Sequence, residues 1–228
     1  MADLAELAGR AVAVPLGAVA RWRGGRPMHP RGAVFDAVLE RHGATPGLGV
    51  PWLDEVRTEP VVVRLSRGAG LPAPLPDVLG LAIRLGSDDA PVDLLLSSTG
   101  RGAWGRLVPL PRIGAEVTYG SIMAYSSAAG PIRIAALPAT SGGSSDPGPV
   151  AGAASDRVLA FTLAAAVGRG AWRPFARLYS TAAQDRLDTA MRFDAVRNAP
   201  PGLVPDGPLA RFREPSYATA RRSGARGR

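Results

Sequence analysis

The chain has no cysteine and no lysine, and only two histidines among its 228 residues. Without cysteine it can form neither a disulfide framework nor a thiolate metal site. Two histidines are too few for the His-rich centre of a di-metal phosphoesterase. No apolar run has the length of a membrane-spanning helix, and the absence of cysteine fits a reducing compartment. We therefore expect a cytoplasmic protein that makes no membrane contact.

Three signals of other protein classes are also missing. Asp3 and Glu6 stand where a secretory signal has its basic start, and Pro15 interrupts the apolar stretch 11–20, so no such signal is expected. No serine lies in a G-x-S-x-G elbow, which disfavours a serine hydrolase. The stretch Ser66-Arg-Gly-Ala-Gly70 lacks the Gly-Lys-Ser/Thr end of a P-loop and is interpreted as a turn.

The net charge of +8 comes from arginine alone, which supplies all 27 basic residues. Six of these arginines lie in residues 208–228, together with a single acid, Glu214. A terminal run of one charge is usually a solvated tail. We therefore do not expect nucleic-acid binding from the net charge, and we expect residues 223–228 to be a basic disordered tail.

Short apolar segments separated by proline and glycine predict a mainly β fold. Hydrophobic residues are 46% of the chain, and its length fits one domain over residues 1–228. Even spacing of short strands indicates a barrel or a sandwich. Residues 139–155, rich in Ala, Gly, Ser and Pro, predict a flexible loop, and helices are expected over 3–13 and 208–222. The expected strands are Pro60–Ser66, Val78–Leu85, Val92–Ser97, Arg106–Pro109, Glu116–Tyr125, Ile132–Leu137, Val158–Val167 and Trp172–Tyr179.

Several segments, in order along the chain, resemble the haem-binding motifs of the catalase superfamily. The early segment runs Arg26-Pro-Met-His29-Pro-Arg-Gly32, and the late one runs Arg213-Glu-Pro-Ser-Tyr217. Between them stand Val63-Arg-Leu-Ser66 and Asp93-Leu-Leu-Leu-Ser-Ser98, and Arg192-Phe-Asp and Asn198-Ala-Pro-Pro-Gly202 precede the last segment. The resemblance covers residues 20–222 in patches. It implies an α+β variant of the mainly β class, a catalase-like antiparallel β-barrel with peripheral N- and C-terminal helices.

The resemblance also implies a haem site and assigns its residues. Tyr217 would be the axial ligand of the haem iron, with Arg213 beside it. His29 would be the distal acid and base, and Ser66 would hydrogen-bond its imidazole and fix the tautomer. Arg26 and Arg64 would bind the haem propionates.

The function that follows is a peroxide-dependent peroxidase, a small bacterial relative of the catalases, whose partners are peroxide and a small reductant. Catalases have an asparagine pair where this chain has Ser97 and Ser98. One of those asparagines assists peroxide binding, so we expect weak catalase activity. The same change favours an alternative, a haem-free or non-catalytic barrel with a binding or structural role.

Taken singly, the site residues have simpler interpretations. Tyr217 can be an amphipathic tyrosine that packs a helix on the barrel. His29 can be a surface histidine; Pro30, which follows it, favours an extended backbone at this position. His42 lies in a turn-like Glu-Arg-His-Gly context and is interpreted as structural or exposed. The sequence leaves the oligomeric state open, a homo-oligomer included.

Overall fold

The computed structural model describes residues 29–87, 89–139, 144–148, 159–184 and 191–206. Ten strands dominate these residues, joined by one short helix, α2 (Pro51–Asp54), and one 3-10 turn, η1 (Gly105–Leu107). The strands are β1 (Gly32–His42), β2 (Val56–Arg67), β3 (Leu79–Leu85), β4 (Val92–Ser98), β5 (Tyr119–Gly120), β6 (Ala124–Ser126), β7 (Ile132–Pro138), β8 (Ala160–Val167), β9 (Arg173–Ala183) and β10 (Val204–Asp206).

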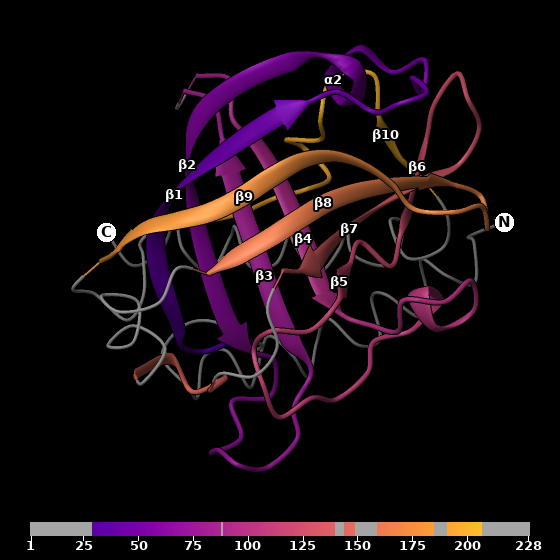
Figure 1. The fold of residues 1–228 in the computed structure, drawn as a ribbon. Coiled ribbons are helices and arrows are strands. Elements are labelled where there is room, and N and C mark those ends of the chain that lie inside the picture. Colours follow the sequence, from indigo (N-terminus) through magenta and orange to yellow (C-terminus); the bar gives the residue numbers. More distant parts are fainter. Residues whose placement is uncertain (1–28, 88, 140–143, 149–158, 185–190, 207–228) are drawn as a thin grey trace, which may run out of the picture.

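Eight of the strands close into an antiparallel barrel (Figure 1). Their order around the barrel is β7-β5-β4-β3-β2-β1-β9-β8, and the β7–β8 ladder closes the ring. The short strands β6 and β10 extend the sheet beyond β7. The mainly β class and the barrel expected from the sequence are therefore confirmed.

Side chains fill the inside of the barrel, because successive residues of a strand point to opposite faces of the sheet. On β1 the inward residues Ala33, Phe35, Ala37 and Leu39 are buried. Their neighbours on β2 and β3 continue the same core, with Leu65, Val63, Ile83 and Leu81. The alternate residues face outward, and on β2 these include Val62, Arg64 and Ser66.

Three expectations about the strands need correction. Residues 106–109 are not a strand: η1 occupies 105–107, where Arg106 N–H donates to the carbonyl of Gly102. The single strand expected over 116–125 is two short strands, β5 and β6, interrupted by Ile122 in a left-handed conformation (φ 56°). The eleven-residue strand β1 was not expected, because its sequence mixes Val and Phe, which favour strands, with Ala, Leu, Glu and Arg, which favour helices.

Parts of the sequence-based organisation fall on residues that the structure does not describe. The helices expected over 3–13 and 208–222, and the tail 223–228, lie outside the described residues. Of the expected loop 139–155, the structure describes residue 139 and residues 144–148. There, Ser144 bridges Gly114 and the buried Ser145 hydroxyl donates to the carbonyl of Ile113.

Candidate functional site on the outer barrel face

His29 lies three residues before β1. Every second residue from Arg64 onward, namely Arg64 and Ser66 of β2 and Gly68 just after it, forms a hydrogen bond with His29. Its backbone N–H donates to the carbonyl of Gly68 at 2.7 Å. Arg64 Nη2 donates to the carbonyl of His29 at 2.9 Å. The imidazole Nδ1 lies 2.9 Å from the hydroxyl of Ser66. Backbone and side chain are thus both tied to one strand, so the imidazole has a defined position on the outside of the barrel.

The backbone at His29 has a left-handed conformation, with φ of 55°. The sequence-based expectation of an extended backbone before Pro30 is therefore wrong. A non-glycine residue in this region costs about 1–2 kcal/mol and persists only where its surroundings impose it. The hydrogen bonds to Gly68 and Arg64 impose it here. Such strain is common where a side chain is held for a function.

Two glycines make room for the side chains of this site. A Cβ atom on Gly80 of β3 would lie 2.6 Å from His29 Cε1 and 2.8 Å from its Nδ1. A Cβ atom on Gly32 of β1 would lie 2.7 Å from the Arg64 guanidinium carbon. The imidazole therefore lies directly against the backbone of β3, and the guanidinium lies against that of β1.

The hydroxyl of Ser66 lies within hydrogen-bond distance of both the His29 imidazole and the backbone of β3. The Ser66 hydroxyl lies 3.4 Å from the carbonyl of Gly80, to which it can only donate. When this hydrogen is directed to Gly80, the hydroxyl can accept from Nδ1–H of His29. In that tautomer the lone pair of the imidazole is on Nε2. A neutral imidazole with this tautomer is a proton acceptor at Nε2.

Ladder pairing extends the outer face across four strands. Gly32, Ser66, Gly80 and Ser97 pair in sequence from β1 to β4. Ser97 therefore lies in the same row as the residues around His29. The hydroxyl of the neighbouring Ser98 instead accepts from Leu79 N–H at 2.9 Å and donates to the carbonyl of Leu110 at 2.7 Å. Only Ser97 of this pair belongs to the His29 face.

The buried carboxylate of Asp93, four residues before Ser97 on β4, binds a segment distant in sequence to the same outer face. Asp93 is fully buried and receives a two-pronged contact from Arg84 at 2.7 and 2.6 Å. The same carboxylate accepts from Asp194 N–H at 2.8 Å and from the Asn198 side chain at 2.7 Å. Residues 191–198, which the resemblance places before the late motif, are thus fixed beside β3 and β4.

The residues that the sequence singled out separate into two groups. His29, Ser66 and Arg64 come together, with the hydrogen bond between Ser66 and His29 present. Arg26, Arg213 and Tyr217 lie outside the described residues. His42 is exposed at the far end of β1, where its Nδ1 lies 2.9 Å from the carbonyl of Gly43. Sequence reasoning missed Gly68 and Gly80, whose roles depend on register between strands.

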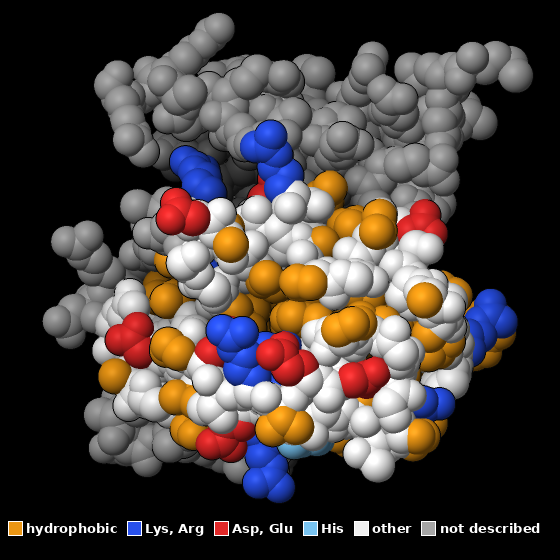
Figure 2. All heavy atoms as spheres, turned by 90° about the horizontal axis from the view of Figure 1, so that it is seen from above, with side chains coloured by type: hydrophobic (Ala, Val, Ile, Leu, Met, Phe, Trp, Pro, Cys, Tyr) orange, Lys and Arg blue, Asp and Glu red, His pale blue; other side chains and the backbone are white. Residues whose placement is uncertain are grey.

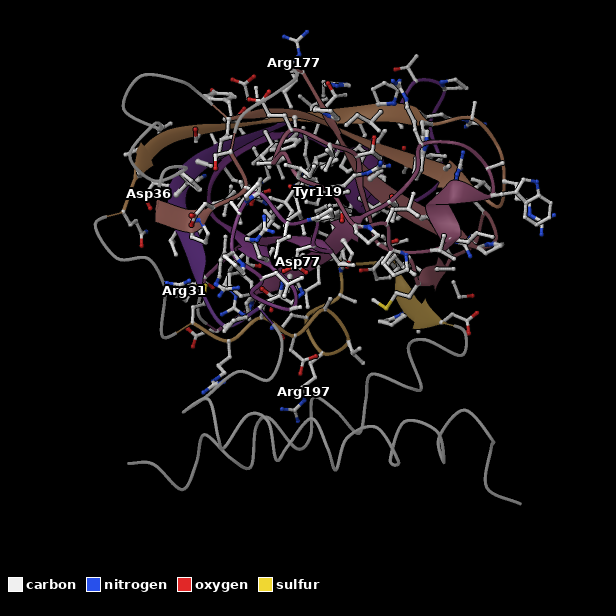
Figure 3. All side chains as sticks on the ribbon, turned by 90° about the horizontal axis from the view of Figure 1, so that it is seen from below. Arg31, Asp36, Asp77, Tyr119, Arg177 and Arg197 are labelled. Atoms are coloured by element: carbon white, nitrogen blue, oxygen red, sulfur yellow. The ribbon has the colours of Figure 1, made fainter. Side chains whose placement is uncertain are left out.

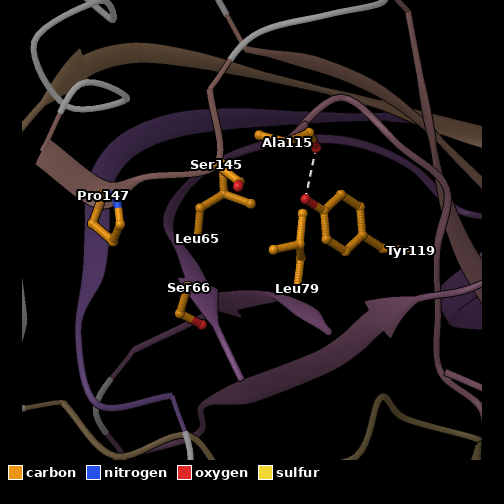
Figure 4. A pocket seen from close by; sticks show the side chains of 7 residues that line it. All are labelled: Leu65, Ser66, Leu79, Ala115, Tyr119, Ser145 and Pro147. Atoms are coloured by element: carbon orange, nitrogen blue, oxygen red, sulfur yellow. Dashed lines mark hydrogen bonds between the residues drawn. The ribbon is translucent and has the colours of Figure 1, made fainter. Parts of the chain in front are cut away.

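A small cavity of about 10 Å³ lies beneath the site (Figure 4). That volume is about enough for one water molecule. Its lining includes Ser66 and the fully buried Tyr119, whose hydroxyl donates to the carbonyl of Ala115 at 2.6 Å. Burial, followed by the charge of Glu116, raises the pKa of Tyr119 far above its ordinary value. Tyr119 is thus a buried, neutral tyrosine at ordinary pH.

Comparison with known proteins gives no independent assignment of the site. No protein-family model matches the chain, and no curated protein matches it significantly. Within the described part of the chain, no helix has the length and apolar character needed to cross a bilayer.

Proposed function

We propose that the outer face of β1–β4 is the distal side of a haem site and that the protein is a haem-dependent peroxidase related to the catalases, with weak catalase activity. The observation that carries the proposal is the fixed imidazole of His29. It stands in a strained backbone position, its carbonyl accepts from Arg64, and its Nδ1 is hydrogen-bonded to Ser66. Backbone strain of this kind, held by its surroundings, is a basis for proposing a function.

The described residues fit a flat and largely apolar group with negative charge at its edge. The wall beneath the imidazole consists of small residues, Gly80 and Ala82 on β3 and Gly32 on β1. Leu95 on β4 adds an apolar side chain in the row of Ala82. Arg64 gives this face a positive charge, and guanidinium groups suit carboxylates such as haem propionates.

His29 would act as acid and base on hydrogen peroxide. Nε2 takes the proton from one peroxide oxygen and returns it to the other, which leaves as water when the O–O bond breaks. Ser66 keeps Nδ1 protonated throughout, and Arg64 and Gly68 keep the ring from turning away. Bound haem would supply the two electrons that this cleavage needs, and the small reductant would later restore them.

Ser97 is the reason to expect weak catalase activity. Oxygen release requires a second peroxide molecule to be held close to the first site of reaction. A serine hydroxyl is shorter than an amide and offers one hydrogen where an amide offers two. Ser97 would therefore bind the second peroxide molecule less well than an asparagine does. One-electron oxidation of a reductant does not require a second peroxide molecule in the site.

Absorption spectroscopy of protein expressed with ample haem tests the cofactor. We expect a Soret band, and we expect Tyr217→Phe to change the charge-transfer bands, because this substitution removes the phenolate and keeps the ring. Tyr179→Phe is the control, since Tyr179 lies on β9 and donates to Glu40. Wild-type protein without a Soret band would favour the haem-free alternative, and an unchanged Tyr217→Phe spectrum would remove Tyr217 as ligand.

A further inference from the structure

A second cluster of polar residues lies away from His29, where two arginines stack on two tryptophans. The guanidinium of Arg169 lies 3.9 Å from the ring centre of Trp104, and that of Arg106 lies 4.2 Å from the ring centre of Trp172. Trp104 and Arg106 come from the loop that follows β4, and Arg169 and Trp172 come from the β8–β9 connection. Segments more than sixty residues apart in sequence thus meet at one side of the barrel.

Hydrogen bonds hold the two loops together. Arg106 Nη1 donates to the carbonyl of Gly170 at 3.0 Å, and its Nε donates to that of Gly102 at 3.3 Å. Trp172 Nε1 donates to the carbonyl of Arg101 at 2.8 Å. Arg106 and Trp172 are therefore the fixed base of the cluster, and Trp104 and Arg169 are its accessible part.

The cluster gathers like charges. Within the described residues, no salt bridge includes Arg106, Arg133 or Arg169. Burial and then the charge of Arg133 lower the pKa of Arg106, and burial and then the charge of Arg169 lower the pKa of Arg133. Guanidinium groups that repel one another are stabilised by a bound anion. Phosphate suits them well, because its oxygens match the guanidinium fork.

The exposed tryptophan specifies the ligand further. Trp104 is 67% exposed although its side chain is among the largest apolar groups of the chain. Arg169 covers one face of its indole ring. The other face can stack on a planar ring, the contact that aromatic residues make with nucleic-acid bases. We infer that Trp104 and Arg169, supported by Arg106 and Trp172, form a binding site for a nucleotide, either free or as a unit of a single strand.

This inference is independent of the haem proposal and differs from an argument based on net charge. The expectation against nucleic-acid binding rested on the arginines of residues 208–228, none of which belongs to this cluster. On the face shown in Figure 2, acidic and basic side chains are intermixed. The combination of an aromatic face with arginines that form no salt bridge to any described residue distinguishes the cluster from a generally basic surface.

Fluorescence anisotropy of a labelled oligo-dT, with ATP, tripolyphosphate and adenosine as competitors, tests the site. We expect Trp104→Ala to weaken oligonucleotide binding at least about fivefold, the low end for loss of one stacked base, and Trp104→Phe to retain most of it. Arg169→Gln should weaken binding more than Arg177→Gln, which changes the net charge equally. Arg177 is exposed and points away from the barrel (Figure 3).

The competitors distinguish the two sources of the ligand. Displacement of the oligonucleotide by ATP, but not by equal tripolyphosphate or adenosine, assigns the site to a free nucleotide. Binding of the oligonucleotide that ATP does not displace assigns it to a single strand. The inference is overturned if neither the labelled oligo-dT nor ATP binds, or if tripolyphosphate displaces the oligonucleotide as well as ATP does. It is also overturned if Trp104→Ala binds the oligonucleotide as tightly as the wild type. Equal effects of Arg169→Gln and Arg177→Gln would also overturn it.

Discussion

At the scale of single residues, the conformation of His29 depends on what surrounds it more than on its own preferences. Pro30 favours an extended backbone, yet the hydrogen bonds of His29 N–H to the Gly68 carbonyl and of Arg64 to the His29 carbonyl hold φ at 55°. The imidazole then lies where any residue larger than glycine at position 80 would collide with it. A substitution at position 80 can therefore displace the imidazole while His29 itself is unchanged.

Gly80→Ala is expected to displace the imidazole. The added Cβ would meet ring atoms at 2.6 and 2.8 Å, so either the ring or β3 must shift. We expect a loss of about 1–3 kcal/mol in the free energy of unfolding, the usual cost of overpacking, and a changed chemical shift for His29 in NMR spectra. Gly102→Ala is the control, because a Cβ there meets nothing within 4 Å. Equal stability of the two variants would contradict this geometry.

Tyr119 predicts a pH dependence of stability at alkaline pH. Burial raises its pKa in the folded protein above the value of about 10 in an unfolded chain. Folding thus favours the protonated form, so stability is fully present below pH 10 and falls as the pH rises above it. Urea unfolding should show a loss approaching ~1.4 kcal/mol per pH unit above pH 10 from this residue. Tyr119→Phe should flatten that decline, and an identical slope in the variant would refute the assignment.

At the scale of elements, the buried Asp93 carboxylate connects β4 to residues 191–198. Asp93→Asn removes the charge that Arg84, Asp194 and Asn198 share. Removing one partner of a buried ion pair costs ~3–5 kcal/mol, and we expect the low end because the Arg84 side chain is 16% exposed. Hydrogen exchange should quicken at Asp194 N–H. Asp89→Asn, at an exposed position after β3, should change neither quantity; unaltered exchange in Asp93→Asn would contradict the docking.

Strands were predicted correctly from the sequence where they are rich in β-branched residues or follow proline and glycine. Segments close to β2, β3, β4, β7, β8 and β9 were all expected as strands. β1 was missed because its residues suit a helix as well as a strand, and its conformation depends on pairing with both β2 and β9. The pairing of Ser66 with His29 was foreseen from motifs, whereas the parts of Gly68 and Gly80 follow from strand register, which single motifs do not encode.

At the scale of the whole molecule, closure of the barrel decides where a ligand can bind. Large side chains such as Phe35, Ile83 and Phe175 are fully buried in the core. An eight-stranded barrel is just wide enough for side chains to fill it. A haem would therefore lie against the outer face of β1–β4, where His29 stands. The nucleotide site proposed above lies on other loops, so each can be disabled without the other.

The central claim is that His29 is the acid and base of a haem peroxidase. Peroxide-dependent oxidation of a small reductant by haem-loaded protein tests it most directly, when variants of the two histidines of the chain, His29 and His42, are compared with the wild type. Loss of a positioned acid and base costs ~10²–10⁴ in rate, so His29→Ala should lower turnover at least about a hundredfold with its haem content retained. His42→Ala should have wild-type turnover, because His42 is exposed at the other end of β1. Oxygen release should stay small beside reductant oxidation. Unchanged turnover in His29→Ala would contradict the account.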